Sequence, residues 1–402
     1  MARLLEHHAL NLLREGGIPV PVFRVVSTPE AAKEAATQLG GPVVLKALIP
    51  VGGRGKAGAI KVAETPEEAM ERAQELLGRF ILNFSVNELL VSELVKIRKE
   101  FFVSLTFDSM SRGPVVLFSS LGGVDVEAVF EKDPDRFIQR PVDISVGLQP
   151  FQAREIAESA GLEGKNLMET AEILPRLYRI FRQFDAQTAE VNPLALTDAG
   201  GLIAPSAVIV IDNQALFRHP ELKGIADQDQ TNGWRPLSPL ENEMRAIDRT
   251  DSSSAIRFNE FESGDIAFMI TGGGAGLLTF DSILRLGAKP ATTFDITPGR
   301  VEEKMYLATK AILAKPGLTG MIAGGNITNF ISIDVKVKGV MRALKELNID
   351  PKKFPVVFRF AGPGVEVARE LASELPGIEF YDAATSLEDA VKRIVELTKG
   401  GC

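Results

Sequence analysis

The chain has 402 residues, of which 45% are hydrophobic and 24% are charged, and its formal net charge is -8. At roughly 100–200 residues per domain this length predicts two or three domains, and the composition excludes a disordered or fibrous protein. The acidic balance gives no general attraction to nucleic acid, and no basic face in the sequence offsets it.

Helices and short strands alternate in the N-terminal half. Apolar spacing predicts a helix over residues 6–14 and an extended strand at 19–22. Threonine, proline and glutamate at 28–30, and again at 65–67, are typical of a helix start, while Gly40 and Gly41 are typical of a helix end. We expect strands at 42–47 and 60–62, then 89–91 paired with 101–106, and 115–119 paired with 203–211.

The pattern changes from about residue 265 to strand, glycine-rich turn and helix, repeated several times. Strands are expected at 266–270, 321–323, 356–358 and 378–380, with glycine turns at 272–276, 324–325 and 362–364. A helix is expected at 279–286, and another starts at 386–388. This alternation predicts an open parallel α/β sheet whose loops leave from one edge. The polar segment before it, 223–262, is the expected linker.

Several residue types are scarce or missing. The single cysteine, Cys402, excludes an intrachain disulfide and a cysteine-based metal site, which indicates a cytoplasmic protein. Residues 1–20 are too charged for a signal peptide, and no apolar run reaches the roughly 20 residues of a membrane span. The histidines His7, His8 and His219 leave residues 220–402 without one.

A glycine-rich loop carries the first functional signal. Lys46 precedes the segment 52–58, which reads GGRGKAG and lies between two predicted strands, a context that argues against a Walker P-loop. Glycines allow successive backbone N–H groups to face an anion, and Lys46, Arg54 and Lys56 add positive charge. The segment therefore predicts a lid over nucleotide phosphates. The alternative is a flexible hairpin with solvated basic side chains.

A carboxylate and an amide carry the second signal. Glu190 and Asn192 are two residues apart, so they lie on one side of an extended strand. Oxygen donors on one face suit Mg²⁺, which keeps waters and nucleotide phosphates as its other ligands. The alternative is an acidic strand that ends in an Asn-Pro turn.

Together these segments resemble the ATP-grasp superfamily, and specifically the β subunits of succinyl-CoA synthetase (succinate–CoA ligase, ADP-forming) and related ADP-forming acid–CoA ligases. The matching stretches are Lys46 with 52–58, then 122–127, 190–194 and 215–218. The resemblance implies an α/β fold with an ATP-grasp domain of two α+β lobes over residues 1–238, including the start of the linker 223–262. A flavodoxin-like parallel α/β CoA-ligase domain follows over residues 263–402.

The resemblance also implies a reaction and a partner. ATP phosphorylates a histidine, the phosphate activates a carboxylate as an acyl phosphate, and CoA displaces it to give acyl-CoA, ADP and phosphate. The histidine and the CoA site belong to an α subunit, in an αβ or α₂β₂ assembly. The lack of histidine after His219 fits this division, because the phosphohistidine must come from elsewhere.

By this resemblance Lys46, Gly53, Arg54, Gly55 and Glu100 would contact ATP, with Lys46 also acting in catalysis. Asn192 and Ser206 would hold Mg²⁺, and Glu190 would lie beside the incoming phosphohistidine and orient its imidazole. An equal alternative for Glu190 is a direct or indirect ligand of Mg²⁺. The family has an aspartate where this chain has Ser206, a weaker ligand, although Asp212 on the same face of the strand could supply the charge.

Other positions also depart from the family. Ser92 replaces an acidic residue that Glu93 could restore after a shift of one position. Thr271 opens the first glycine turn, and Gly325, Asn326 and Ile327 form the second, so these four residues are the expected substrate site, with close packing as the alternative role of the glycines.

The segments 295–300 (DITPGR) and 326–330 (NITNF) differ from the succinate enzymes, and 326–330 is more similar to ATP-citrate lyase and citryl-CoA synthetase. Arg300, Arg342 and Arg359 are available to bind additional carboxylates.

The sequence therefore predicts an enzyme, the β subunit of an ADP-forming carboxylate–CoA ligase, with succinate as the first candidate acid. A citryl-CoA synthetase large subunit or a ligase for malate or another acid is the alternative within the class. A non-catalytic regulatory subunit is the alternative outside it, suggested by Ser92 and Ser206. The choice between ATP and GTP depends on the loop 93–98 and is left open.

Overall fold

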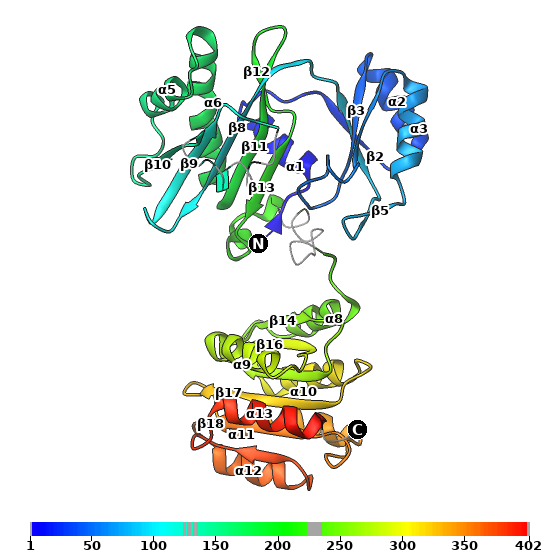
Figure 1. Cartoon of the computed structure of the whole chain (residues 1–402), viewed down its shortest axis with the longest axis vertical. Coiled ribbons are helices and arrows are strands. Elements are labelled where there is room, and N and C mark those ends of the chain that lie inside the picture. Colours follow the sequence, from blue (N-terminus) through cyan, green and yellow to red (C-terminus); the bar gives the residue numbers. More distant parts are fainter. Residues whose placement is uncertain are drawn as a thin grey trace. The chain divides into compact units, whose positions relative to one another are not determined.

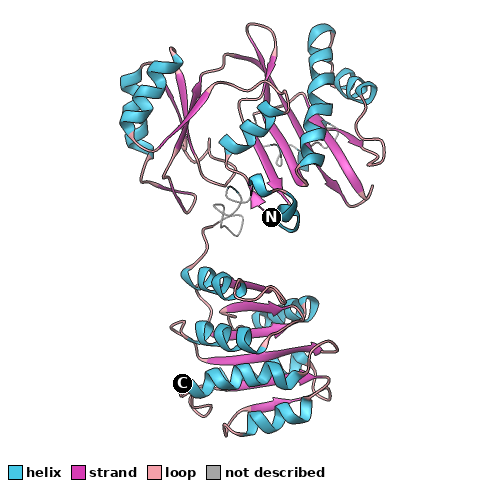
Figure 2. Cartoon of the chain, turned by 180° about the vertical axis from the view of Figure 1, so that it is seen from behind, coloured by secondary structure: helices cyan, strands magenta, loops and turns pink. Residues whose placement is uncertain are grey.

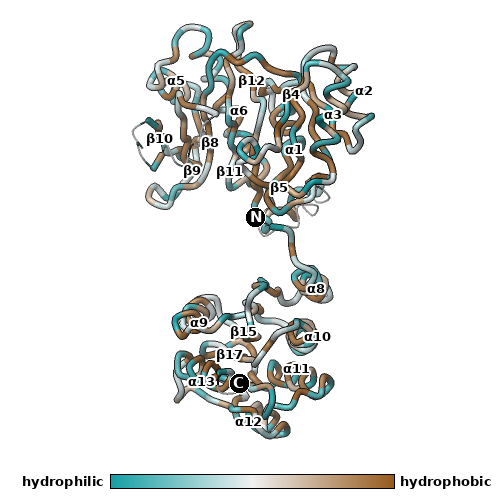
Figure 3. The backbone as a smooth tube through the Cα atoms, turned by 45° about the vertical axis from the view of Figure 1, so that its right-hand side comes forward, coloured by the Kyte–Doolittle hydropathy of each residue, from teal (hydrophilic) through white to brown (hydrophobic). Residues whose placement is uncertain are grey.

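The computed structural model describes residues 2–123, 126, 130, 131, 133, 136–222, 225 and 235–399. The chain divides into two compact units, Met1–Pro236 and Leu237–Cys402 (Figure 1). Hydrophobic residues concentrate on the strands of both units (Figure 3). Among the described helices, none is long and apolar enough to cross a membrane.

A seven-stranded antiparallel sheet forms the larger lobe of the N-terminal unit within the described residues. Its strand order is β1-β13-β11-β8-β9-β10, with β12 paired to β11. The strands are β1 (Ala2–Arg3), β8 (Ile97–Asp108), β9 (Gly113–Ser119), β10 (Ile138–Pro141), β11 (Ala186–Thr197), β12 (Leu202–Ile203) and β13 (Ala207–Ile211). The helices α1 (Glu6–Glu15), α5 (Pro150–Ser159) and α6 (Gly164–Gln183) share its hydrophobic core.

A four-stranded antiparallel sheet with its own core forms the smaller lobe, again among the described residues. Its order is β2-β7-β3-β4, and α2 and α3 cover its outer side (Figure 1). The elements are β2 (Phe23–Val26), α2 (Pro29–Leu39), β3 (Val43–Ala47), β4 (Ile60–Ala63), α3 (Pro66–Leu76) and β7 (Leu89–Glu93), with a hairpin of β5 (Phe80–Ile81) and β6 (Phe84–Ser85). The predicted caps are confirmed, because Thr28 and Thr65 accept hydrogen bonds from the first turns of α2 and α3.

Strand pairing differs from the prediction. The expected pair 89–91 with 101–106 is wrong, since β7 pairs with β2 and β3 while β8 lies in the other sheet. The expected pair 115–119 with 203–211 is also wrong, because β9 lies between β8 and β10. The strand expected at 19–22 starts only at Phe23, since prolines at 19 and 21 cannot donate to a sheet.

A four-stranded parallel sheet, β15-β17-β18-β19, forms the described centre of the C-terminal unit. One face packs against α10, α11 and α12, and the other against α9 and α13 (Figure 2). The elements are β15 (Ile266–Thr271), α9 (Gly273–Arg285), β16 (Thr292–Ile296), α10 (Glu302–Leu313), β17 (Gly320–Ile327), α11 (Ile333–Glu346), β18 (Val356–Ala361), α12 (Val365–Ser373), β19 (Glu379–Tyr381) and α13 (Leu387–Lys399). The predicted parallel α/β sheet is confirmed.

The boundary between the units falls within the expected linker 223–262, but the second part of that segment contains regular structure. The division falls between Pro236 and Leu237, so α8 (Pro239–Asp248) and β14 (Ile256–Glu260) belong to the C-terminal unit. There β14 pairs with β16, and a capping box of Ser238 and Glu241 starts α8. The sequence analysis did not predict these two elements because a polar composition is typical of a linker.

The glycine turns also differ. The helix expected at 279–286 already begins at Gly273, and Gly324 and Gly325 lie inside β17. A Cβ at Gly324 would stand 2.0 Å from the Arg359 carbonyl oxygen, and one at Gly325 would stand 2.6 Å from the Thr271 carbonyl oxygen. Close approach of neighbouring strands therefore requires these two glycines.

Candidate functional site

The glycine-rich loop joins β3 to β4 in the smaller lobe. Gly53 and Gly58 have φ angles of 71° and 69°, a left-handed conformation that favours glycine. The amides of residues 57–59 donate to the carbonyls of 53–55, which closes the turn. The loop thus has a defined backbone, with Gly53 and Gly58 at positions that other residues tolerate poorly.

A buried carboxylate holds the two main cations of this region. Glu6 Oε1 lies 3.0 Å from Lys46 Nζ, and Glu6 Oε2 lies 2.7 Å from Arg54 NH2. Lys46 also donates to the Pro205 carbonyl at 2.8 Å, and Arg54 donates to the Ala47 carbonyl at 3.2 Å. We call these residues the Glu6 cluster. It ties α1, on the larger sheet, to β3 and the glycine loop on the smaller one.

Electrostatics keep this carboxylate ionised. Burial alone would raise the pKa of Glu6, but the charges of Lys46 and Arg54, with hydrogen bonds from Lys46 and Ser206, lower it to about 2. The sequence analysis did not identify Glu6. The sequence feature that could have revealed Glu6 is its position: an acidic residue on the buried face of a helix, at the spacing of Ala9, Leu10 and Leu13.

Glu100 and Asn192 meet at one backbone segment. The Gly123 amide donates to Asn192 Oδ1 at 2.9 Å, and a Cβ at Gly123 would overlap the Glu100 carboxylate. Gly122 also donates to the Glu100 carbonyl at 3.2 Å. The rest of the predicted motif 122–127 lies outside the described residues, except for residue 126.

Strand register brings the remaining predicted residues to the same region. Glu190 on β11 lies opposite Ser104 of β8 and Val208 of β13, and Val191 lies opposite Ala207. Ser206, which precedes β13, is thus adjacent to Asn192, and its side chain hydrogen-bonds Glu6. The structure therefore gathers Lys46, Arg54, Glu100, Asn192 and Ser206, with Glu190 two residues along β11.

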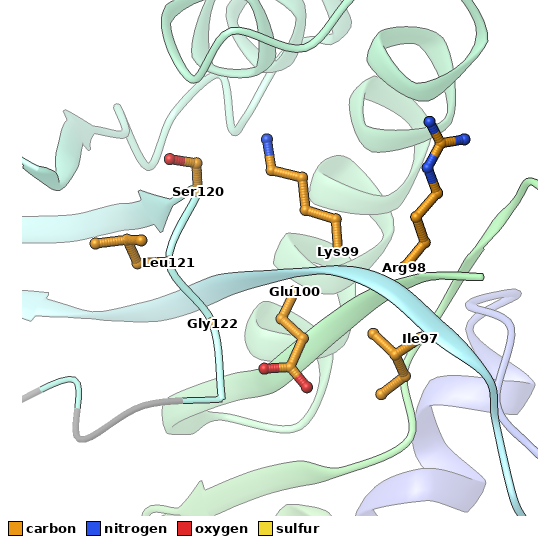
Figure 4. Close-up of a pocket in the computed structure, with 7 residues that line it drawn as sticks. All are labelled: Ile97, Arg98, Lys99, Glu100, Ser120, Leu121 and Gly122. Atoms are coloured by element: carbon orange, nitrogen blue, oxygen red, sulfur yellow. The ribbon is translucent and has the colours of Figure 1, made fainter. Parts of the chain in front are cut away.

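A cavity of about 370 Å³ opens beside this region. It is lined by residues 97–100 of β8 and 120–122 after β9, and Lys99 and Glu100 project from opposite sides of β8 (Figure 4). The Lys99 ammonium lies 5.0 Å from the centre of the Phe101 ring. The lining of this cavity therefore includes both positively and negatively charged side chains, Glu100 among them.

Asp212 and Glu93, which the sequence offers as replacements for missing carboxylates, do not occupy the positions of Ser206 and Ser92. Asp212 lies at the far end of β13, about 20 Å of strand from Ser206, where it caps the 3₁₀ helix Asn213–Arg218. Ser92 is buried within β7, whereas Glu93 is exposed and accepts a hydrogen bond from the Val22 amide at 3.2 Å. Asp212 is therefore too far along β13 to replace Ser206, and Glu93 points to the opposite side of β7 from Ser92.

The predicted substrate residues of the C-terminal unit also lie together. Thr271 and Gly325 are register partners at the ends of β15 and β17, and a Cβ at Gly272 would lie 3.8 Å from Asn326 Cβ. Asn326 is exposed, and its Oδ1 accepts from the Ile327 amide at 2.8 Å. Thr271, however, is buried, and its hydroxyl donates to the Gly324 carbonyl at 3.2 Å.

Buried cations flank these residues, and the sequence analysis identified one of them. Arg359 is buried and donates to the Gly325 carbonyl at 2.9 Å, whereas Arg300 and Arg342 form surface ion pairs with Asp251 and Glu303. Lys336 on α11 was missed. It is 4% exposed, and its ammonium donates to Thr271 Oγ1 at 3.2 Å. The sequence feature that could have revealed Lys336 is a lysine at an apolar position of a helix.

Comparison with known proteins covers the whole chain. A family model described as an ATP-grasp domain matches residues 3–196, and one described as ATP citrate lyase citrate-binding matches residues 235–397. The chain is 39% identical over 399 residues to a succinate–CoA ligase [GDP-forming] subunit beta of Thermus thermophilus, covering 99% of each. It is 35% identical over 400 residues to an ADP-forming subunit beta of Ignicoccus hospitalis, covering 98% of this chain and 99% of that one.

Solved structures show the same fold. An ATP citrate lyase from Methanothrix soehngenii, in complex with citrate and coenzyme A, superposes with a TM-score of 0.72 at 20% identity and covers 100% of both chains. A mutant of the Methanosaeta concilii ATP citrate lyase in complex with (3S)-citryl-CoA gives a TM-score of 0.72 at 18% identity, with 98% and 100% coverage. At these identities the likeness concerns the fold alone.

Proposed function

The chain belongs to the family of succinate–CoA ligase β subunits, and we propose that it is the nucleotide-binding β subunit of an ADP-forming carboxylate–CoA ligase. The observation that carries the proposal is the convergence of Lys46, Arg54, Glu100 and Asn192 beside the middle of β11 and the start of β13. In this role the complex converts ATP, a carboxylate and CoA to acyl-CoA, ADP and phosphate.

Lys46 and Arg54 are suited to bind the ATP phosphates even while Glu6 holds them. An ammonium has three donors and a guanidinium has five, and Glu6 with the Pro205 and Ala47 carbonyls takes only part of this set. Glu6 fixes both cations in advance, so they need no reorganisation when phosphate arrives. The backbone of Gly53, Arg54 and Gly55 and the side chain of Glu100 complete the proposed nucleotide site.

Residues in the middle of β11 and just before β13 fit a magnesium ion. Asn192 and Ser206 offer oxygen atoms, and Glu190 is the nearest carboxylate along β11. Mg²⁺ prefers oxygen ligands and takes several of them from water and nucleotide phosphates, so a small protein donor set is sufficient. When bound, the ion would neutralise charge on the phosphates. Asn192 would position it, and Ser206 would make a weaker contribution than a carboxylate.

An α-type partner would supply the phosphohistidine and the CoA site. Large apolar side chains are exposed near the carboxyl edge of the C-terminal sheet, namely Leu277, Leu278, Ile327 and Phe330. Such a group of exposed side chains is typical of a protein interface. Glu190 is the residue proposed to orient the incoming imidazole, and either αβ or α₂β₂ assembly satisfies this arrangement.

Succinate is the first candidate substrate, because the full-length relatives with 33–39% identity are named succinate–CoA ligases. One observation favours citrate as a second candidate: residues 235–397 match a citrate-binding model. A panel of succinate, citrate, malate and smaller acids separates the two. Relatives are named both ADP-forming and GDP-forming, so the panel is run with ATP and with GTP.

Substitution of Lys46 tests the proposed nucleotide site. In the complex with its α-type partner, Lys46→Met should abolish nucleoside diphosphate release, whereas Lys61→Met, in the neighbouring strand β4 and paired with Glu75, should leave it unchanged. Because Lys46→Met also disrupts the Glu6 cluster, Glu100→Gln provides a second variant and should raise the KM for ATP. Undiminished turnover in Lys46→Met and Glu100→Gln would contradict the site and favour the regulatory subunit.

A further inference from the structure

The C-terminal unit contains a buried ammonium without an ion-pair partner among the described residues. Lys336 is 4% exposed, and its hydrogen-bond partner is the neutral hydroxyl of Thr271, at 3.2 Å. Thr271 in turn donates to the Gly324 carbonyl, so the hydroxyl is fixed between a cation and a carbonyl. A buried charge without a counter-ion is unfavourable, which makes Lys336 an exception that requires a reason.

Nearby carboxylates do not remove this imbalance. Burial lowers the pKa of the Lys336 ammonium, and the charge of Asp295 offsets this only in part. Asp295 Oδ1 already accepts hydrogen bonds from the Gly272 amide at 2.8 Å and the Ile296 amide at 3.0 Å. On α11 itself, Asp334 accepts a hydrogen bond from Ser332. Among the described residues, neither carboxylate forms an ion pair with the Lys336 ammonium.

Other positive features converge on the same place. Lys336 is the fourth residue of α11, where the helix dipole disfavours a cation, and α9 begins at the adjacent Gly272–Gly273 turn. Arg359 approaches the β17 glycines from a different strand and donates to the Gly325 carbonyl. Gly272, Gly273, Gly274 and Asn326 are exposed, and Gly272 directly follows Thr271, whose hydroxyl Lys336 contacts. An anion that binds at this exposed turn from solvent would therefore lie close to the charge of Lys336.

We propose that Lys336 is a positioning residue for the acid substrate, its ammonium serving as the fixed counter-ion of a carboxylate bound at Gly272–Gly274 and Asn326. This inference rests on the proposed function and deepens it, because it assigns a specificity role to a residue outside the glycine turns. Lys336 acts through Thr271 and the local field, so its loss weakens binding of the acid without altering the nucleotide site.

The test compares two lysines of one helix in the full complex. Lys336→Met keeps the length of the side chain and removes its charge, whereas Lys338→Met changes an exposed lysine that pairs with Glu302. We expect Lys336→Met to raise the KM for the acid about 10- to 100-fold, the usual effect of losing a charged contact, with unchanged KM for ATP. Lys336→Arg should recover part of the loss, and Lys338→Met should match the wild type.

Thermal unfolding distinguishes a binding role from a structural one. If Lys336 awaits a substrate, Lys336→Met should raise the Tm of the full chain while it impairs acid binding, because an uncompensated buried charge has been removed. A lowered Tm, or an equal rise in the KM for ATP and for the acid, would show that Lys336 only supports the fold and would overturn the inference.

Binding by the full chain keeps the inference testable if the complex has no ligase activity. Equilibrium dialysis with succinate, citrate and inorganic phosphate should show acid binding to the wild type that Lys336→Met loses. Acid binding without turnover would reject the proposed function and retain the inference. Equal acid binding by both proteins, or loss of phosphate binding alone, would reject the inference itself.

Discussion

Lys46 and Lys336 are equally buried lysines, at 6% and 4% exposure, but their surroundings differ. Lys46 contacts the Glu6 carboxylate at 3.0 Å, whereas Lys336 contacts a neutral hydroxyl at 3.2 Å. The first charge is balanced by the protein, so it holds two lobes together and, in the proposed nucleotide site, stays in place for a phosphate. The second is not balanced, which indicates that its partner arrives from outside. A comparison of counter-ions thus separates a structural charge from a substrate-dependent one.

The largest expected effect comes from breaking the balanced cluster. Glu6→Gln would leave Lys46 and Arg54 buried without their carboxylate, and loss of one member of a buried ion pair costs about 3–5 kcal/mol. Chemical denaturation of the N-terminal unit should show this loss. Glu67→Gln, in an exposed pair with Lys33, should change stability little. An equal effect of the two variants would contradict the role of the Glu6 cluster.

Acid should weaken the same cluster. The folded pKa of Glu6 is about 2 against an ordinary value of 4.5, so its stabilisation is complete above pH 4.5 and disappears as the pH falls towards 2. The difference corresponds to about 3 kcal/mol. Because other carboxylates titrate in this range, the measurement is the difference between wild type and Glu6→Gln, which should shrink from pH 5 to pH 2. A constant difference would be inconsistent with this pKa.

A methyl group added to β17 should have an intermediate effect on the C-terminal unit. Gly325→Ala would place a Cβ 2.6 Å from the Thr271 carbonyl and hydroxyl oxygens, and such overpacking costs about 1–3 kcal/mol. It should also displace Thr271 and hence Lys336. Gly41→Ala in the N-terminal unit, which meets no atom within 4 Å, is the matched control. The midpoints of denaturant unfolding of the two variants provide the comparison.

The smallest effect should have a pH dependence of the same sign as that of Glu6, but in the alkaline range. Because the pKa of Lys336 is lowered in the folded state, the folded chain releases this proton first, and stability increases as the pH rises from the folded pKa towards the ordinary value. Wild type should therefore gain stability relative to Lys336→Met on the alkaline side. A relative loss there would mean that Lys336 has a buried anionic partner.

Local signals in the sequence were sufficient for many elements. The caps at Thr28 and Thr65, the stop at Gly40 and the two short strands that flank the glycine loop depend on residues close in the chain, and the structure confirms them. The convergence of Lys46, Arg54, Asn192 and Ser206 was also anticipated, through family resemblance. Their individual roles stay predictions.

Contacts between distant segments could not be read in the same way. The partners of β7 and β9 depend on which sheet each strand joins, and a short apolar run does not specify this. Glu6 and Lys336 each occupy an apolar position of a helix, and their meaning depends on groups 40 and 65 residues away in the sequence. The glycines of β17 resembled a turn because the close approach of Arg359 and Thr271 lies outside local sequence.

The most direct test of the account measures nucleoside diphosphate release by the chain co-expressed with an α-type partner, with each component omitted in turn. The account predicts multiple-turnover release only when Mg²⁺, ATP or GTP, CoA, the partner and one carboxylic acid are all present, because phosphorylation of the partner's histidine alone stops after a single turnover. Multiple-turnover release that needs no carboxylate, or none with any acid from a complex that assembles and unfolds cooperatively, would contradict it.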